Sequence, residues 1–167
     1  MFVSLHGVGK HPEDRKNFGL YPGTATTPEV EERLVNVPLR ALVGPEEYLK
    51  KFDEQVVPAV TKFLSTHRGL IIISCGFDAC IGDSPAHENG FLHLTPRTYG
   101  DITKRITELS ATLCQGRLVS LLEGGYKGKT SKGGEGPLVQ SFRAHIRQLM
   151  SAAEQARGEP AAAAAAP

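Results

Sequence analysis

The sequence predicts an α/β protein, in which helices cover both faces of a mainly parallel sheet to give three αβα layers. Two short apolar runs, residues 70–75 and 117–122, have the length and composition of buried strands. A segment with helical periodicity begins between them at Thr95-Pro96. Strand, helix and strand in this order form a βαβ unit, and the same alternation extends over most of the chain.

The first third of the chain predicts two strands separated by a long polar segment. Residues 2–5 have the pattern of a buried strand, and residues 34–39, LVNVPL, form a second one. Between them, residues 7–33 are rich in Gly, Pro and Asn, with a turn signature at Tyr21-Pro22-Gly23. We expect an ordered loop there, and such long loops are uncommon unless they are functional or disordered.

The middle of the chain predicts one helix and one strand. A helix follows Pro45, with a kink expected at Pro58, and its apolar residues recur at helical spacing: Tyr48, Phe52, Val56, Val60 and Phe63. The run 70–75, LIIISC, is continuously apolar, as in parallel strands covered on both faces.

Two further helices are predicted in the last half. The helix capped by Thr95 has the expected buried face Tyr99, Ile102, Ile106, Leu109 and Leu113. The last helix, residues 137–156, places Leu138, Phe142, Ile146 and Leu149 on one side. We expect residues 1–150 to form one domain and residues 151–167 to form an Ala-rich, low-complexity tail.

Composition excludes several classes of function. The 167 residues carry 19 Lys+Arg against 18 Asp+Glu, mixed along the chain, so no footprint for nucleic acid or an anionic membrane is present. The longest apolar run is far shorter than the ~20 residues of a membrane span. The cysteines, Cys75, Cys80 and Cys114, are odd in number and lack CxxC spacing, which favours reduced thiols over disulfides or a zinc site.

Two strand ends carry the candidate site, because ligands bind at the carboxyl ends of strands in open α/β sheets. Asp78 and Asp83 follow the strand 70–75 within SCGFDACIGD. A carboxylate there can be a metal ligand, a catalytic base or a helix cap, and spacing alone favours the cap.

The second strand end, LEGGYKGKT, allows two interpretations. Gly128-Lys129-Thr130 supplies the end of a phosphate-binding loop, but the position of the first glycine of that motif is Glu123. Alternatively, Gly124-Gly125 lets the backbone approach a ligand and leaves the Tyr126 hydroxyl free to donate a hydrogen bond. The tyrosine interpretation requires fewer matching residues than the phosphate-binding loop does.

A family resemblance supports the tyrosine. The segments VSLHG, YPGT, NVPL, SCGFDACIGD and RLVSLLEGGY follow the order and approximate spacing of the carboxyl-terminal half of zinc-dependent histone deacetylases. The chain most resembles the class II and acetylpolyamine-deacetylase-like branch, over residues 2–150. The resemblance implies an arginase/deacetylase-like fold that is truncated on its amino-terminal side.

The resemblance also implies residue roles. Asp78 matches the carboxylate ligand of zinc, and Tyr126 matches the tyrosine that hydrogen-bonds the acetyl carbonyl. Tyr21 matches a wall of the acyl-lysine channel, where the family usually has phenylalanine. Gly124-Gly125 matches the platform that holds Tyr126. Ser4 and Leu5 resemble part of a structural potassium site.

Other family motifs are absent from this sequence. The family takes two further zinc ligands from an Asp-x-His motif and its base from a His-His pair, and the chain contains neither. We therefore expect a partial deacetylase domain that is inactive alone. A non-catalytic interaction module and a nucleotide-binding protein remain alternatives. The resemblance implies an acetylated protein or peptide substrate, corepressor-type partners, and a location in nucleus or cytoplasm.

Overall fold

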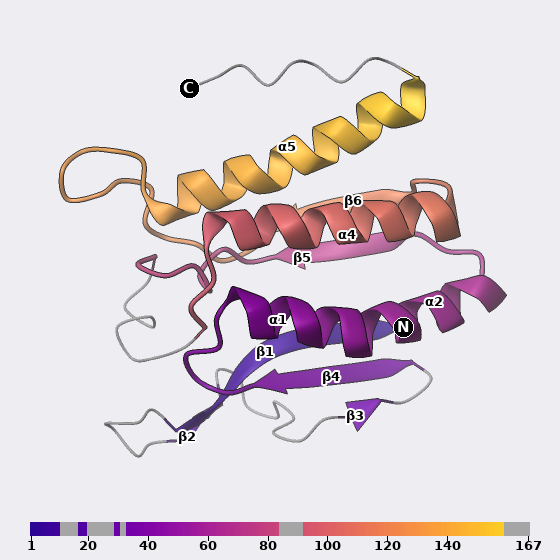
Figure 1. Ribbon diagram of the computed structural model, residues 1–167, viewed down its shortest axis with the longest axis horizontal. Helices are drawn as coiled ribbons and strands as arrows, with labels where there is room; N and C mark the ends of the chain where they lie inside the picture. Colours follow the sequence, from indigo (N-terminus) through magenta and orange to yellow (C-terminus); the bar gives the residue numbers. More distant parts are fainter. Residues whose placement is uncertain (11–16, 20–28, 31–32, 84–91, 159–167) are drawn as a thin grey trace.

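The computed structural model describes residues 1–10, 17–19, 29–30, 33–83 and 92–158. It confirms the α/β class (Figure 1). The elements in chain order are β1 (Phe2–Lys10), β2 (Asn17–Gly19), β3 (Glu29–Val30), β4 (Leu34–Leu39), α1 (Pro45–Lys51), the π-helix η1 (Phe52–Val56), α2 (Val57–Thr66), β5 (Ile71–Cys75), α4 (Pro96–Cys114), β6 (Leu118–Leu122) and α5 (Pro137–Arg157).

The strands form two sheets. One has the order β2-β1-β4-β3, in which β1 and β4 are parallel, and the other is the parallel pair β5-β6. The predicted βαβ unit is confirmed as β5-α4-β6, with Ile73 paired to Ser120. In Figure 1 α4 runs alongside this pair, while α1 and α2 lie in front of β1, and β4 is seen below them.

The first strand is longer than predicted. β1 continues to Lys10, because Val8, Gly9 and Lys10 pair with β2 in an antiparallel ladder. Glycine weakens a strand on its own, so only this partner strand keeps the segment extended. The predicted loop 7–33 therefore contains strand residues, and Tyr21 lies outside the described part of the chain.

The helical segment after Pro45 contains an irregular turn. The irregularity expected at Pro58 is the π-helix η1, which covers Phe52–Val56 in the turn directly before this proline. Pro58 has no N–H to donate to the preceding turn, which breaks the regular hydrogen-bond ladder at that point. The wider π turn brings Phe52 and Val56 into the core.

The core lies between the strands and the helices, and its buried apolar members are Val35, Val37, Leu39, Val43, Phe52, Val56, Phe77, Cys80, Leu92, Leu94, Tyr99 and Cys114. The predicted buried face of α4 was partly wrong. Tyr99 is buried, whereas its apolar neighbours Ile102, Ile106 and Leu109 are only partly buried. The most buried row of α4 also includes polar residues: Thr98, Thr103, Thr107 and Ser110.

A buried histidine explains part of this polar row. His145 of α5 is 1% exposed and lies between Thr103 of α4 and Ser120 of β6. The Thr103 hydroxyl donates to the Tyr99 carbonyl at 2.6 Å, so its oxygen accepts from His145 Nδ1 at 2.7 Å. Nε2 then accepts from the Ser120 hydroxyl at 2.9 Å. This arrangement is that of a neutral imidazole with its proton on Nδ1, and burial favours the neutral form by lowering the pKa of His145.

We expect His145 to make stability depend on pH. Burial lowers the pKa of His145 below the ordinary 6.5, so the unfolded chain takes up a proton at a higher pH than the folded chain does. The contribution of His145 to the free energy of unfolding is fully present above pH 6.5. It decreases as the pH falls, by up to about 1.4 kcal/mol per pH unit. Urea unfolding from pH 7 to 5 measures this slope. The His145→Gln variant should be less stable at pH 7 but show a flatter slope, and an equal slope in both proteins would contradict the assignment.

The β5-β6 pair is covered on one face only. Ile71, Ile73 and Cys75 are partly buried on the helical side, whereas Ile72 is 60% exposed on the other side. β6 repeats the pattern, with Leu121 49% exposed. The prediction that residues 70–75 are covered on both faces is therefore wrong for this chain. The apolar run reflects a face that the described residues leave open.

The exposed sheet face, defined by Ile72, Val119 and Leu121, should cause self-association of the isolated chain. Residues Phe2–Gly7 of β1 add a strand edge, since among the described residues they pair only with β4. We expect the Ile72→Thr/Leu121→Thr variant to shift sedimentation toward the monomer. Met150→Gln, which alters an exposed residue of α5, is the control. A monodisperse wild-type monomer with a sharp thermal transition would contradict this prediction.

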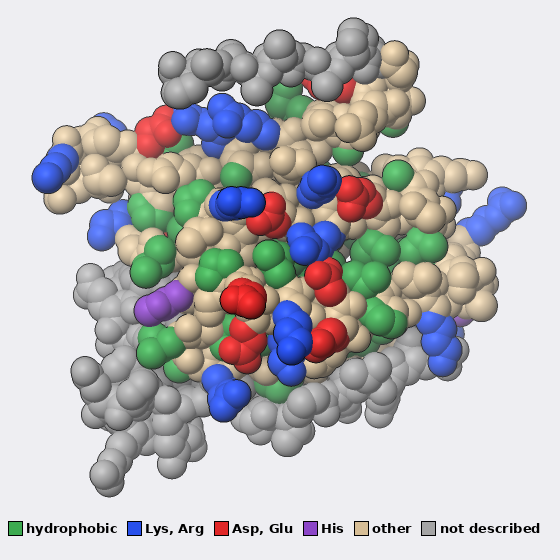
Figure 2. Space-filling view, in the orientation of Figure 1, with side chains coloured by type: hydrophobic (Ala, Val, Ile, Leu, Met, Phe, Trp, Pro, Cys, Tyr) green, Lys and Arg blue, Asp and Glu red, His purple; other side chains and the backbone are tan. Residues whose placement is uncertain are grey.

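The helical face of the molecule carries mixed charges. Figure 2 shows Lys and Arg interspersed with Asp and Glu there, and α4 contributes the exposed pairs Arg97–Asp101 and Lys104–Glu108. This face offers no basic patch for nucleic acid. No described helix is long and apolar enough to cross a membrane.

Candidate functional site

The two predicted site segments are joined beyond the ends of their strands. After β5 and β6 end, Glu123 N–H donates to the Cys75 carbonyl at 3.0 Å, and Phe77 N–H donates to the Gly124 carbonyl at 2.7 Å. The parallel ladder thus continues into both turns. Because the carboxyl ends of parallel strands meet at one edge, Asp78 and Tyr126 follow adjacent turns.

Two glycines make room for the Asp78 carboxylate. A Cβ on Gly124 would lie 2.7 Å from Asp78 Oδ2, and one on Gly76 would lie 3.1 Å from Oδ1. Gly124 has no positive φ, so close approach rather than backbone conformation requires glycine there. Gly124, which the resemblance assigns to the platform of Tyr126, also lies against the Asp78 carboxylate.

Gly125 is required for a different reason. Its φ of +128° is one that L side chains rarely adopt, and a Cβ would lie 2.6 Å from Leu138 Cδ1. Phe77, directly before Asp78, is buried and packs on Tyr99 with ring centroids 5.1 Å apart. The core therefore fixes the backbone on both sides of the site.

Asp83 performs a role that spacing did not predict. Its Oδ2 accepts from Tyr126 N–H and its Oδ1 from Lys127 N–H, both at 2.9 Å. The prediction of a helix cap is wrong for Asp83, because the N–H groups it receives belong to the loop after β6. The sequence signal was a carboxylate directly after Gly82, whose φ is +79°, but its partner lies 43 residues away.

The phosphate-loop interpretation finds no support in the geometry of Gly128-Lys129-Thr130. Thr130 N–H donates to the Gly134 carbonyl at 2.8 Å, and Gly134 N–H donates to the Thr130 hydroxyl at 3.0 Å. These groups close a turn on themselves, and Lys129 bridges to Glu135. A phosphate loop needs such N–H groups free and directed at the ligand.

The described residues do not form a complete metal site. Asp78 is held by its glycine cradle, but no group of three or more His, Cys, Asp or Glu side chains in the described ranges could hold a metal ion. All three cysteines are free, and burial raises the pKa of the Cys75 thiol to about 12, which disfavours a thiolate ligand. Ser4 hydrogen-bonds His6 Nδ1 at 2.8 Å on β1, the strand that also carries Leu5.

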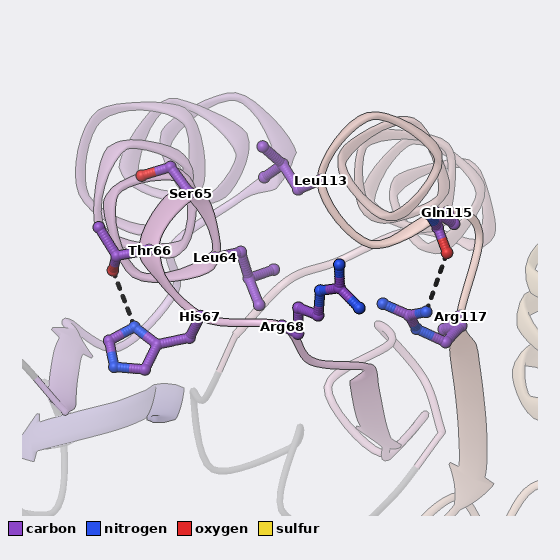
Figure 3. Close-up of a pocket in the computed structure, with 8 residues that line it drawn as sticks. All are labelled: Leu64, Ser65, Thr66, His67, Arg68, Leu113, Gln115 and Arg117. Atoms are coloured by element: carbon purple, nitrogen blue, oxygen red, sulfur yellow. Dashed lines mark hydrogen bonds between the residues drawn. The ribbon is translucent and has the colours of Figure 1, made fainter.

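A surface pocket lies at the opposite end of the strands. It has a volume of about 240 Å³, and Figure 3 shows its lining, which includes His67, Arg68 and Arg117. Arg117 donates to the Gly69 carbonyl and to Gln115. Because Ile71 and Leu118 begin β5 and β6 there, this pocket is separate from the edge with Asp78 and Tyr126.

Comparison with known proteins identifies the family of this chain. Residues 1–135 match the histone deacetylase domain family. A probable deacetylase of Archaeoglobus fulgidus is 33% identical over 126 residues, covering 75% of this chain and 32% of the relative. Histone deacetylase 15 of Arabidopsis thaliana is 36% identical over 132 residues, covering 75% and 21%.

A solved structure gives the same result for the fold. The HDA15 HD domain superposes with a TM-score of 0.58 at 27% identity, covering 96% of this chain and 38% of that one. This match confirms the predicted deacetylase-type fold, of which the described residues form a partial αβα domain. The chain spans between a fifth and a third of the length of the two relatives described above. By its family match, its relatives and its fold, this chain belongs to the histone deacetylase domain family.

Proposed function

We propose that this chain supplies Asp78 and Tyr126 to a zinc-dependent deacetylase that hydrolyses the amide of acetyl-lysine in histones or other proteins. The observation that carries the proposal is the continued ladder between the two strand ends, with Phe77 N–H on the Gly124 carbonyl at 2.7 Å. It fixes a carboxylate and a tyrosine at one edge of the sheet.

Each residue has a distinct role in this proposal. Asp78 is one zinc ligand, and its glycine cradle prevents the carboxylate from being displaced by a Cβ. Zinc, when bound, would polarise the acetyl carbonyl and activate a water molecule. Tyr126, whose side chain is 70% exposed, donates its hydroxyl proton in a hydrogen bond to the oxygen on which negative charge develops.

The remaining groups come from outside this chain in our proposal. A catalytic zinc needs about three protein ligands and an open position, and this sequence has no His-His and no Asp-x-His. A segment with these motifs would supply two ligands and the base. Ser4 and Leu5 are proposed for a potassium site, and Tyr21, Gly124 and Gly125 for the substrate channel. Corepressor-type proteins are proposed as partners, and nucleus or cytoplasm as the location.

A fusion experiment tests the division of the site. The chain alone should bind zinc no better than a surface carboxylate and should not deacetylate an acetyl-lysine peptide. The fused enzyme, in which a family amino-terminal segment with both motifs precedes Met1, should bind one zinc ion per chain and deacetylate. Zinc is measured by metal analysis after dialysis, and deacetylation by mass spectrometry.

Either of two results would contradict the proposal. Stoichiometric zinc and deacetylation in the unfused chain would show that the division of residues is wrong. A folded fused enzyme without zinc or activity would reject the deacetylase function for this chain. The exposed face of β5-β6 would then favour the second candidate, a non-catalytic interaction module.

A further inference from the structure

Asp83 is a buried carboxylate that the proposed chemistry does not use. It is 3% exposed, and both of its oxygens accept backbone N–H groups from consecutive residues, Tyr126 and Lys127. Burying a carboxylate is costly unless it is hydrogen-bonded. The two hydrogen bonds therefore offset the desolvation cost of burying the Asp83 carboxylate. A carboxylate on the surface does not have this cost.

The segment that carries Asp83 is itself fixed in place. Asp83 N–H donates to the Cys80 carbonyl at 3.0 Å, and Ile81 N–H donates to the Leu94 carbonyl at 2.8 Å. Gly82 has a φ of +79°, a conformation that L side chains rarely adopt. Asp83 consequently projects from a turn that is closed by its own hydrogen bonds and by those to Leu94.

Tyr126 depends on its backbone for its position. Its phenol is 70% exposed, and its own hydroxyl makes no hydrogen bond with the described residues. Its N–H, in contrast, is held by Asp83, and the next N–H is held by the same carboxylate. The backbone sets the direction of the Cα–Cβ bond of Tyr126, and its φ and ψ decide which staggered rotamers the phenol can adopt.

We infer that Asp83 is a positioning residue, which aims the Tyr126 hydroxyl at the reacting carbonyl by holding the N–H groups of Tyr126 and Lys127. This inference rests on the proposed function. Asp83 is not available as a ligand or base, since both of its oxygens already accept hydrogen bonds and the side chain is buried. Misplacing a catalytic group by about 1 Å can lower a rate on the order of 10²-fold.

The claim that Asp83 holds the N–H groups of Tyr126 and Lys127 is tested on the full chain by amide hydrogen exchange. In Asp83→Asn, a side-chain NH₂ would face one of the two backbone N–H donors, so at least one bond is lost. Exchange at the Tyr126 and Lys127 amides should rise at least about 10-fold, while exchange at Ile73 and Val119 in the strands stays the same. Asp101→Asn, which alters an exposed carboxylate of α4, is the matched control. Unchanged protection at Tyr126 and Lys127 would overturn the inference.

The claim that Asp83 affects turnover by positioning the Tyr126 hydroxyl is tested in the fused enzyme. Asp83→Asn should lower kcat on the order of 10²-fold, with KM and zinc content unchanged. In the Tyr126→Phe background, the same substitution should lower kcat by less than about threefold, because the hydroxyl it positions is absent. An equal loss in both backgrounds would show a general structural effect and overturn the inference. If Asp83→Asn does not fold, Asp83→Glu, which keeps both acceptor oxygens on a longer side chain, is tested by the same comparison.

The two hypotheses fail in different ways. A fused enzyme in which Tyr126→Phe has no effect on kcat would reject the role of Tyr126 in the proposed function, and the catalytic part of this inference with it. A normal effect of Tyr126→Phe together with no effect of Asp83→Asn would reject the positioning role alone.

Discussion

Asp78→Ala in the fused enzyme is expected to abolish zinc binding, and Gly124→Ala is expected to weaken it about 10- to 100-fold. The alanine methyl group would lie 2.7 Å from Asp78 Oδ2 and 2.9 Å from Cγ, which is closer than real contacts allow. The carboxylate must then rotate away from the edge where the metal would bind. Zinc affinity is measured by competition with a chromophoric chelator.

The control for this prediction is another glycine of the same loop. A Cβ on Gly128 would meet nothing within 4 Å, and Gly128 has no positive φ. Gly128→Ala should therefore leave zinc affinity unchanged. If Gly124→Ala bound zinc as well as the unsubstituted fused enzyme, the carboxylate in that cradle would not be the ligand.

Tyr126→Phe in the fused enzyme should lower kcat by about 10² to 10³, which is roughly 3 to 4 kcal/mol of lost transition-state stabilisation. Only the hydroxyl that donates to the developing negative charge is removed. Zinc content should remain at one ion per chain. The unfolding midpoint should not change either, because the phenol is 70% exposed and contributes little to packing.

Together, the two substitutions separate metal binding from chemistry. Gly124→Ala should lose zinc and activity in parallel, and added zinc should restore part of the activity. Tyr126→Phe should retain zinc, and added zinc should not restore activity. A kcat within about twofold of the unsubstituted fused enzyme would remove Tyr126 from the mechanism that we propose.

The predicted elements succeeded where the sequence pattern is local. The strands 34–39, 70–75 and 117–122 and the helix capped by Thr95 all form as expected. Thr95 and Thr98 make a reciprocal capping box, which such a Thr-Pro start favours. These features depend on residues within a few positions of one another, so a single sequence contains the necessary information.

The prediction of the buried surfaces was less successful. The apolar run 70–75 suggested two covered faces, yet Ile72 is exposed, because coverage depends on which elements pack on each face. On α4, Thr103 is more buried than Ile102, because its hydroxyl meets His145 from α5. Apolar periodicity identifies a helix but does not reveal a polar network between distant segments.

The sequence by itself determined the α/β class, the order of the elements and the family resemblance, from which Asp78 and Tyr126 are proposed as site residues. Only the tertiary structure decided that Gly124 accommodates the Asp78 carboxylate and that Asp83 holds the loop of Tyr126. The physical reason is distance along the chain. Strand ends at one edge of a sheet bring together residues more than 40 positions apart, and close contacts between them leave no periodic signal in the sequence.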